Sequence, residues 1–199
     1  MTSTLLLIRH AMHSDYGDRF TGRGDGVPLT AAGHEQARAL GERLSSEPIS
    51  AIYCSPRQRT RETAVALAAP HGVAVQNEGA LDEIDLGDWT GKRINDLIGT
   101  SEFTAWNERR SKACPPNGER FASVAERASA FARQLSEHHD GKTFALVSHQ
   151  DVIKALVASA LGLSFDNVLR FEIGPASVSR LVWGDWGAKL VTLNEGAAA

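Results

Sequence analysis

The sequence has too few cysteines for a disulfide framework. Cys54 and Cys114 are the two among 199 residues, and we expect both to be free thiols of a reducing compartment. The first apolar run, residues 5–8, is far shorter than the apolar part of a secretory signal, and no segment approaches the length of a membrane span. The net charge of −3 gives no overall attraction to nucleic acid or to an anionic membrane. These absences favour a soluble, cytoplasmic protein without nucleic-acid or membrane partners.

Short apolar segments alternate with helical patterns along the chain. Hydrophobic residues make up 42% of the sequence and charged residues 23%, which is typical of a globular protein with a packed core. Apolar runs predict strands at residues 4–8, 49–53, 73–76, 143–149, 177–183 and 189–193. Helical spacing of apolar residues predicts helices at residues 31–44, 56–69, 94–98, 102–110, 121–135 and 152–161.

This alternation predicts the fold class, a three-layer α/β/α sandwich with a mostly parallel central sheet. Thr30 and Ser55 are expected to cap the two helices that follow them, and Gly162 to end the last helix. We find no internal repeat, low-complexity tract or linker, so residues 1–199 are expected to form a single domain.

Basic side chains follow three of the predicted strands. The run LLLI leads into Arg9 and His10, and FALV leads into Ser148 and His149. The run AIY leads into a segment that begins the next helix and carries Arg57, Arg59 and Arg61. Ligands of open α/β sheets bind beyond the carboxyl ends of the strands, where helix N-termini also favour anions. The sequence therefore predicts a pocket for an anionic ligand at this edge of the sheet.

Phosphoryl transfer suits such a set of side chains. A neutral imidazole is a good nucleophile near pH 7, and attack on phosphorus would give a phosphohistidine intermediate. Arginines can bind the phosphoryl oxygens in bidentate fashion while charge shifts among them. The leaving oxygen also needs a proton from an acid. Four carboxyl groups are close together in LDEIDLGDWTG, and their spacing does not distinguish between Asp82, Glu83, Asp85 and Asp88.

Six stretches of the sequence resemble the motifs of one family, in the order in which that family has them. They are LIRHA, PLTAAGHEQA, YCSPRQRTRET, LDEIDLGDWTG, PPNGER and LVSHQDVIKAL. On these residues the chain resembles the histidine phosphatase superfamily, which includes the cofactor-dependent phosphoglycerate mutases and many small phosphatases. The resemblance spans nearly the whole chain and implies the phosphoglycerate mutase-like fold.

The resemblance assigns a role to each matching side chain. It implies that His10 accepts the phosphoryl group, that Glu83 is the proton donor, and that the phosphate is held by Arg9, Arg59 and His149. It also implies that the enzyme needs no metal, and we expect no cofactor. We further expect four residues to contribute to substrate binding, namely His13, Thr21, Gly22 and Gln150.

The chain departs from the family pattern around the mouth of the expected pocket. Ala11 replaces the glycine of the Arg-His-Gly signature, Gln150 replaces the glycine after the second histidine, and Met12 and Tyr16 stand where the mutases have other residues. These changes concern the choice of substrate more than the phosphoryl chemistry. With Leu86 where mutases show a tyrosine, the pattern favours hydrolysis of a small phosphorylated metabolite.

Several alternatives stay open. The chain could transfer phosphoryl groups as a mutase, or bind a phosphate ligand or partner without turnover, and it could form a homo-oligomer. A metal site is conceivable at His10, His13 and Asp15, because imidazole and carboxylate together suit borderline metals. A tyrosine-phosphatase loop has the pattern Cys-x5-Arg, with five residues between the cysteine and the arginine. The sequence excludes it, because the position of that arginine, counted from Cys54, is occupied by Thr60.

Overall fold

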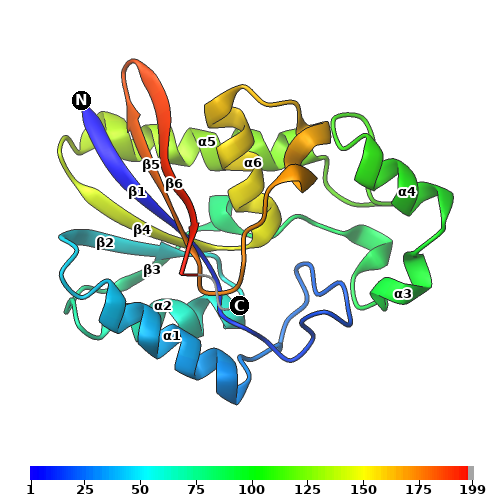
Figure 1. Ribbon diagram of the computed structural model, residues 1–199, viewed down its shortest axis with the longest axis horizontal. Coiled ribbons are helices and arrows are strands. Elements are labelled where there is room, and N and C mark those ends of the chain that lie inside the picture. Colours follow the sequence, from blue (N-terminus) through cyan, green and yellow to red (C-terminus); the bar gives the residue numbers. More distant parts are fainter. Residues whose placement is uncertain (197–199) are drawn as a thin grey trace.

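A six-stranded sheet forms the middle of the protein, for which the computed structural model describes residues 1–196 (Figure 1). The strand order is β3-β2-β4-β1-β5-β6. The first four strands of this order are parallel to one another, β5 is antiparallel to β1, and β6 is antiparallel to β5. The strands are β1 Thr2–Arg9, β2 Ile49–Cys54, β3 Val75–Asn77, β4 Thr143–Ser148, β5 Val178–Gly184 and β6 Gly187–Glu195. The mostly parallel sheet predicted from the sequence is confirmed.

Helices cover both faces of the sheet, which confirms the three-layer architecture. In Figure 1, α1 and α2 lie below the sheet and α5 and α6 lie above it, while α3 and α4 stand together at one end. The helices are α1 Ala31–Arg43, α2 Gln58–Ala68, α3 Ile94–Leu97, α4 Ser101–Glu108, α5 Phe121–His138 and α6 Gln150–Leu161. Short 3₁₀ turns occupy Gly79–Leu81, Gly87–Trp89 and Phe165–Arg170. Within residues 1–196, none of these helices combines the length and the apolar character that crossing a bilayer requires.

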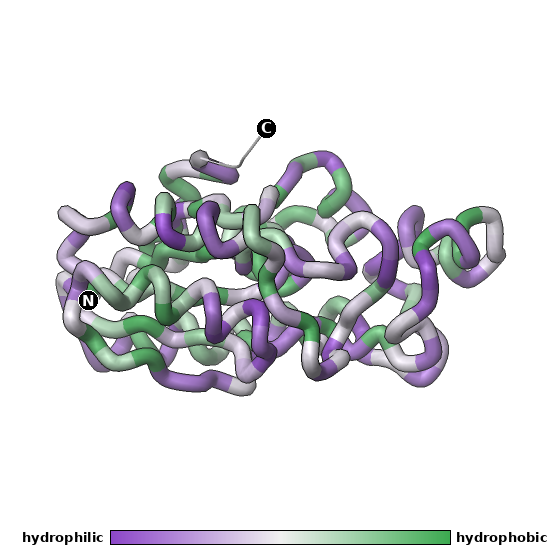
Figure 2. The backbone as a smooth tube through the Cα atoms, turned by 90° about the horizontal axis from the view of Figure 1, so that it is seen from below, coloured by the Kyte–Doolittle hydropathy of each residue, from purple (hydrophilic) through white to green (hydrophobic). Residues whose placement is uncertain are grey.

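Side chains of β1 alternate between two hydrophobic cores because successive residues of a strand point to opposite faces. Leu5 and Leu7 belong to the core beneath α5 and α6, whereas Leu6 and Ile8 belong to the core above α1 and α2. All four are at most 1% exposed. Figure 2 shows hydrophobic segments running through the middle of the body and hydrophilic ones toward its outer turns. The apolar run at the start of the chain is therefore a strand buried on both faces, as its composition predicts.

Helix termini agree with the sequence patterns at two positions and differ at a third. Thr30 caps α1 by accepting a hydrogen bond from the backbone N–H of Gly33 at 3.0 Å, and Gly162 ends α6 with a left-handed φ of 63°. The prediction that Ser55 caps α2 is wrong. The helix begins only after Arg57, and the Ser55 hydroxyl contacts His149, Asp82 and, at 3.4 Å, the backbone N–H of Arg57. Other boundaries differ by a few residues, as for β3, which lies slightly after the predicted 73–76.

Phe121 at the start of α5 is fully buried between two other rings. Its centroid lies 6.1 Å from that of Trp106 and 5.3 Å from that of Phe165. Replacing Phe121 with alanine leaves a cavity among these rings, so we expect a loss of about 3–5 kcal/mol in the free energy of unfolding. Urea unfolding followed by fluorescence measures this loss. Trp186→Ala is the matched control, because that ring is 61% exposed, and equal unfolding midpoints for the two variants would contradict the prediction.

Candidate active site

The ends of β1, β2 and β4 meet at one edge of the sheet. Arg9 at the end of β1 pairs with Ser148 at the end of β4, and Cys54 at the end of β2 pairs with Val147. Backbone hydrogen bonds continue just beyond the strands, since the His10 N–H donates to the Ser148 carbonyl at 3.0 Å. Parallel strands in this order therefore bring residues 9–10, 55–59 and 148–150 together, although they are far apart in the sequence.

A pocket of about 310 Å³ opens at this edge. Two long connections form its mouth: residues 10–30 between β1 and α1, and residues 78–120 between β3 and α5. They are joined by a backbone hydrogen bond from the Gly91 N–H to the Phe20 carbonyl at 2.7 Å. The predicted residues that line the pocket are Arg9, His10, His13, Thr21, Gly22, Arg59, Glu83 and Gln150. Tyr16, which the departures from the family pattern had already placed at the mouth, lines the pocket too, and so do Gly17, Arg19, Phe20, Ile94 and Asp151.

His10 is poised as a neutral nucleophile. Its Nδ1 lies 2.8 Å from the Ala11 carbonyl, which can only accept, so Nδ1 carries the ring proton and Nε2 keeps its lone pair. Burial is the main reason why the pKa of His10 lies well below its ordinary value, and the positive charges of Arg59 and Arg9 lower it further. His10 therefore stays unprotonated at neutral pH, which is the state that can attack phosphorus.

Two buried guanidinium groups at the pocket have free donors. Arg9 donates from Nη1 to the Ile173 carbonyl at 2.6 Å, and Arg59 donates from Nη2 to the Gly22 carbonyl at 2.7 Å. Within residues 1–196, some buried polar atoms at the pocket have no hydrogen-bond partner. They are Nε of Arg9, Nε and Nη1 of Arg59, and the Thr21 hydroxyl. Buried cationic donors without a partner are costly, and a bound anion would satisfy them. The pocket therefore suits a tetrahedral oxyanion.

His149 lies behind the pocket wall rather than in it. It is fully buried, its Nδ1 is 3.1 Å from Arg59 Nη2, and its Nε2 is 2.8 Å from the Ser55 hydroxyl. The ring centroids of His149 and His10 are 5.2 Å apart. The two histidines and Arg59 thus converge as the strand-end pattern predicts, and Ser55 joins them as a contact that the sequence reasoning did not anticipate.

The four neighbouring carboxyl groups have different surroundings in the structure. Glu83 lines the pocket, is 13% exposed, and has an Oε2 that lies 3.6 Å from Nδ1 of His149. Burial raises the pKa of Glu83 to about 7, with a further contribution from the negative charge of Asp151. Asp82 instead pairs with Arg57 at 2.7 Å, Asp85 is 44% exposed, and Asp88 accepts a hydrogen bond from Asn117. Glu83 is therefore the carboxyl placed to exchange protons with a bound ligand near neutral pH.

The model of the histidine phosphatase superfamily (branch 1) matches residues 5–196 of the chain. The chain belongs to this superfamily. It is 32% identical over 180 residues to phosphoserine phosphatase 1 of Hydrogenobacter thermophilus, covering 88% of this chain and 84% of that protein. It is 30% identical to the adenosylcobalamin/alpha-ribazole phosphatase of Escherichia coli, covering 97% and 96%. The structure of YhfR from Bacillus stearothermophilus superposes with a TM-score of 0.90 at 28% identity, covering 99% of this chain and 98% of that one.

These matches confirm the family, the fold and the phosphatase class predicted from the sequence. Across residues 1–196, no three His, Cys, Asp or Glu side chains come together as metal ligands would, and this includes His10, His13 and Asp15. His13 is placed at the pocket instead, 5.1 Å from His10 between ring centroids. Burial and the charges of Arg59 and Arg9 lower the pKa of His13 to about 4, so it is a neutral group at the pocket wall.

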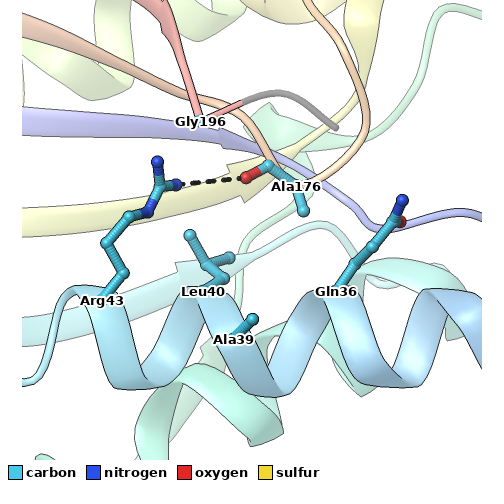
Figure 3. Close-up of a pocket in the computed structure, with 6 residues that line it drawn as sticks. All are labelled: Gln36, Ala39, Leu40, Arg43, Ala176 and Gly196. Carbon is cyan, nitrogen blue, oxygen red and sulfur yellow. Dashed lines mark hydrogen bonds between the residues drawn. The ribbon is translucent and has the colours of Figure 1, made fainter. Parts of the chain in front are cut away.

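A second cavity, of about 240 Å³, lies between α1 and the turn that precedes β5 (Figure 3). Arg43 reaches across it toward the Ala176 carbonyl at 3.4 Å. The other lining residues are Gln36, Ala39, Leu40 and Gly196, and none of them is a nucleophile or an acid. This cavity therefore offers no group for nucleophilic or acid catalysis.

Proposed function

We propose that this phosphatase hydrolyses a small phosphomonoester through a phosphohistidine formed on His10, and that residues 1–199 act as one domain. The observation that carries the proposal is a neutral His10 with a free Nε2 beside two buried arginines that have unpartnered N–H groups. Arg9 and Arg59, the latter held by His149, bind the phosphoryl oxygens. Preorganised donors of this kind stabilise the charge that develops in the transition state.

The reaction has two displacement steps with balanced proton movements. In the first, His10 Nε2 bonds to phosphorus, the ester P–O bond breaks with its electron pair going to the leaving oxygen, and Glu83 supplies a proton to that oxygen. In the second, a water oxygen attacks phosphorus, the ionised Glu83 takes the water proton, and the N–P bond breaks to return a neutral His10. A carboxyl group with a pKa of about 7 can act as acid and then as base at neutral pH.

The pocket and the relatives support a proposal for the substrate class. A pocket of about 310 Å³ holds a phosphoryl group and a small leaving group. One relative is named a phosphoserine phosphatase and another an adenosylcobalamin/alpha-ribazole phosphatase, so both names describe phosphatases of metabolites. We propose that the substrate here is likewise a small phosphorylated metabolite, with its leaving group among Tyr16, Phe20 and Ile94.

A metabolite screen tests the proposed function. Purified protein is incubated with a panel of phosphorylated metabolites, with and without chelator, and released inorganic phosphate is measured beside the His10→Ala protein. We expect chelator-resistant release that depends on His10. A parallel assay in ¹⁸O-water separates transfer to water from transfer to a second alcohol. Release that the His10→Ala protein retains in full would show the proposed function to be wrong.

The loss of kcat in Glu83→Gln is expected to depend on the leaving group of the substrate. For alkyl phosphates, whose leaving oxygen needs a proton, we expect kcat to fall by about 10²–10⁴-fold, and for p-nitrophenyl phosphate by much less. Because the pKa of Glu83 is raised to about 7, the acid form is lost as pH rises above that value. The kcat/KM of the unsubstituted protein for alkyl phosphates should therefore fall above pH 7.

Steady-state kinetics across pH 5–9 on both substrates measure this dependence. The alkaline fall in kcat/KM should disappear in Glu83→Gln. Asp85→Asn is the matched control, because this carboxyl lies two residues away and is 44% exposed. An equal loss on both substrates would assign the proton donor to another group.

A further inference from the structure

The two ring nitrogens of His149 face different partners, and these partners fix where its proton lies. Nδ1 lies 3.1 Å from Arg59 Nη2 and, beyond hydrogen-bond distance, 3.6 Å from Glu83 Oε2. Because a guanidinium group can only donate, Nδ1 accepts in the shorter contact. Burial, followed by the charge of Arg59 and the neighbouring His10, holds the pKa of His149 well below its ordinary value. The ring is therefore neutral and carries its one proton on Nε2, which donates to the Ser55 hydroxyl oxygen at 2.8 Å.

Ser55 connects His149 to a carboxylate by accepting one hydrogen bond and donating another. Its oxygen accepts from His149, so its own hydrogen is free to donate to Asp82 Oδ1, which lies 3.1 Å away. Ser55 is fully buried and Asp82 is 7% exposed, so water does not compete freely for these groups. The result is a directed chain that runs from Arg59 through His149 and Ser55 to Asp82.

Asp82 is a fixed, ionised end for this chain. Arg57 donates to its two oxygens, from Nε at 2.8 Å and from Nη2 at 2.7 Å, and the backbone N–H of Glu83 donates at 2.9 Å. Burial acts to raise the pKa of Asp82, but the hydrogen bonds and charge of Arg57 outweigh burial and hold the pKa below its ordinary value. A carboxylate in this state only accepts, which sets the direction of every bond before it.

We propose that Ser55 and Asp82 are positioning residues that hold His149 in its Nε2–H tautomer, and through it aim the Arg59 guanidinium at the phosphoryl site. Arg59 Nη2 is occupied by His149 and Gly22, which leaves Nε and Nη1 as the donors for the ligand. In the other tautomer, Nδ1 would turn an N–H toward the N–H of Arg59, and the guanidinium would lose its support. The consequence for catalysis rests on the proposed function, whereas the tautomer does not.

Nitrogen NMR of the histidine rings tests the tautomer directly. Protein labelled with ¹⁵N-histidine is compared with Ser55→Ala and Asp82→Asn, and His149→Gln assigns the signals. We expect the unsubstituted protein to show a protonated Nε2 and an unprotonated Nδ1 on His149, and both variants to show a mixture of tautomers. An unchanged His149 tautomer in Ser55→Ala overturns the inference. Since the spectra need no turnover, they remain decisive even if His10→Ala shows the proposed function to be wrong.

A double-mutant cycle with Arg59 tests the positioning role in the reaction. We expect Ser55→Ala to lower kcat/KM for p-nitrophenyl phosphate by about tenfold to a hundredfold, by analogy with partners that orient metal-binding histidines. In an Arg59→Ala background, the same substitution should change kcat/KM by no more than about twofold, because the group it orients is gone. An equal loss in both backgrounds overturns the proposal.

Thr60→Val provides the matched control for structural damage. The Thr60 hydroxyl is fully buried in the same turn and donates to the Ser55 carbonyl at 2.8 Å, without contacting His149. We expect this variant to keep the His149 tautomer and to have the same effect on kcat/KM with and without Arg59. A tautomer mixture in Thr60→Val as large as that in Ser55→Ala would overturn the specific role of the Ser55 hydroxyl.

Discussion

Replacing His10 with alanine is expected to lower turnover by about 10⁴-fold or more, because loss of the covalent nucleophile removes the whole route through the phosphohistidine and not a single contact. The same change should abolish the phosphoenzyme. Protein mixed with a ³²P-labelled phosphomonoester and quenched in alkali measures both effects, since phosphohistidine is labile to acid. The structural reason is the arrangement at Nε2, which is free only because Nδ1 donates to the Ala11 carbonyl.

His13→Ala is the control for this experiment. This second imidazole also lies at the pocket, with its ring centroid 5.1 Å from that of His10, so each of the two substitutions deletes one imidazole from the pocket. We expect His13→Ala to retain the phosphoenzyme and to change turnover far less than His10→Ala. Labelling that is lost from His13→Ala and retained by His10→Ala would move the nucleophile to the other ring.

Arg59→Ala is expected to lower kcat/KM by about 10²–10³-fold, as loss of a preorganised donor to a developing oxyanion does in other enzymes. Arg59 is 2% exposed and has two nitrogens without a partner. Steady-state kinetics on p-nitrophenyl phosphate measure the loss. Arg61→Ala serves as the control, because Arg61 lies two residues further along the same helix and is exposed. Equal rates for Arg59→Ala and the unsubstituted protein would show that the phosphoryl group binds elsewhere.

The same variant should lose the stabilisation that inorganic phosphate gives. A ligand at a hundred times its dissociation constant stabilises the folded state by about 2.7 kcal/mol, and this raises the melting temperature. We expect phosphate to raise the melting temperature of the unsubstituted protein and of Arg61→Ala, but to leave that of Arg59→Ala nearly unchanged.

Much of the site was predictable because the strands determine where the residues that follow them lie. Apolar runs mark β1, β2 and β4, and the residues just after them must meet wherever these strands are parallel neighbours. Arg9, His10 and His149 could therefore be placed from the sequence before any coordinates. The family resemblance added Glu83, which the spacing of the carboxyl groups could not distinguish from its neighbours.

The choice among the carboxyl groups depends on surroundings that spacing does not encode. Asp82 and Glu83 are adjacent, yet one pairs with Arg57 and the other turns into the pocket. Ser55 shows the same limit. A serine before a proline and a helical pattern is typical of an N-cap, but its hydroxyl is engaged by His149, which is 94 residues away in the sequence. Such long-range partners override the local preference of the residue.

The division of labour between the sheet edge and the two long connections bears on how such a protein diversifies. Of the groups proposed to act on phosphorus, Arg9 ends β1 and His10 follows it directly, whereas Tyr16, Arg19 and Ile94 reach the pocket from connections outside the sheet. Substitutions in these connections can alter which alcohol is accepted without rebuilding either hydrophobic core. Natural selection and directed evolution thus have a route to new esters that leaves the phosphoryl machinery intact.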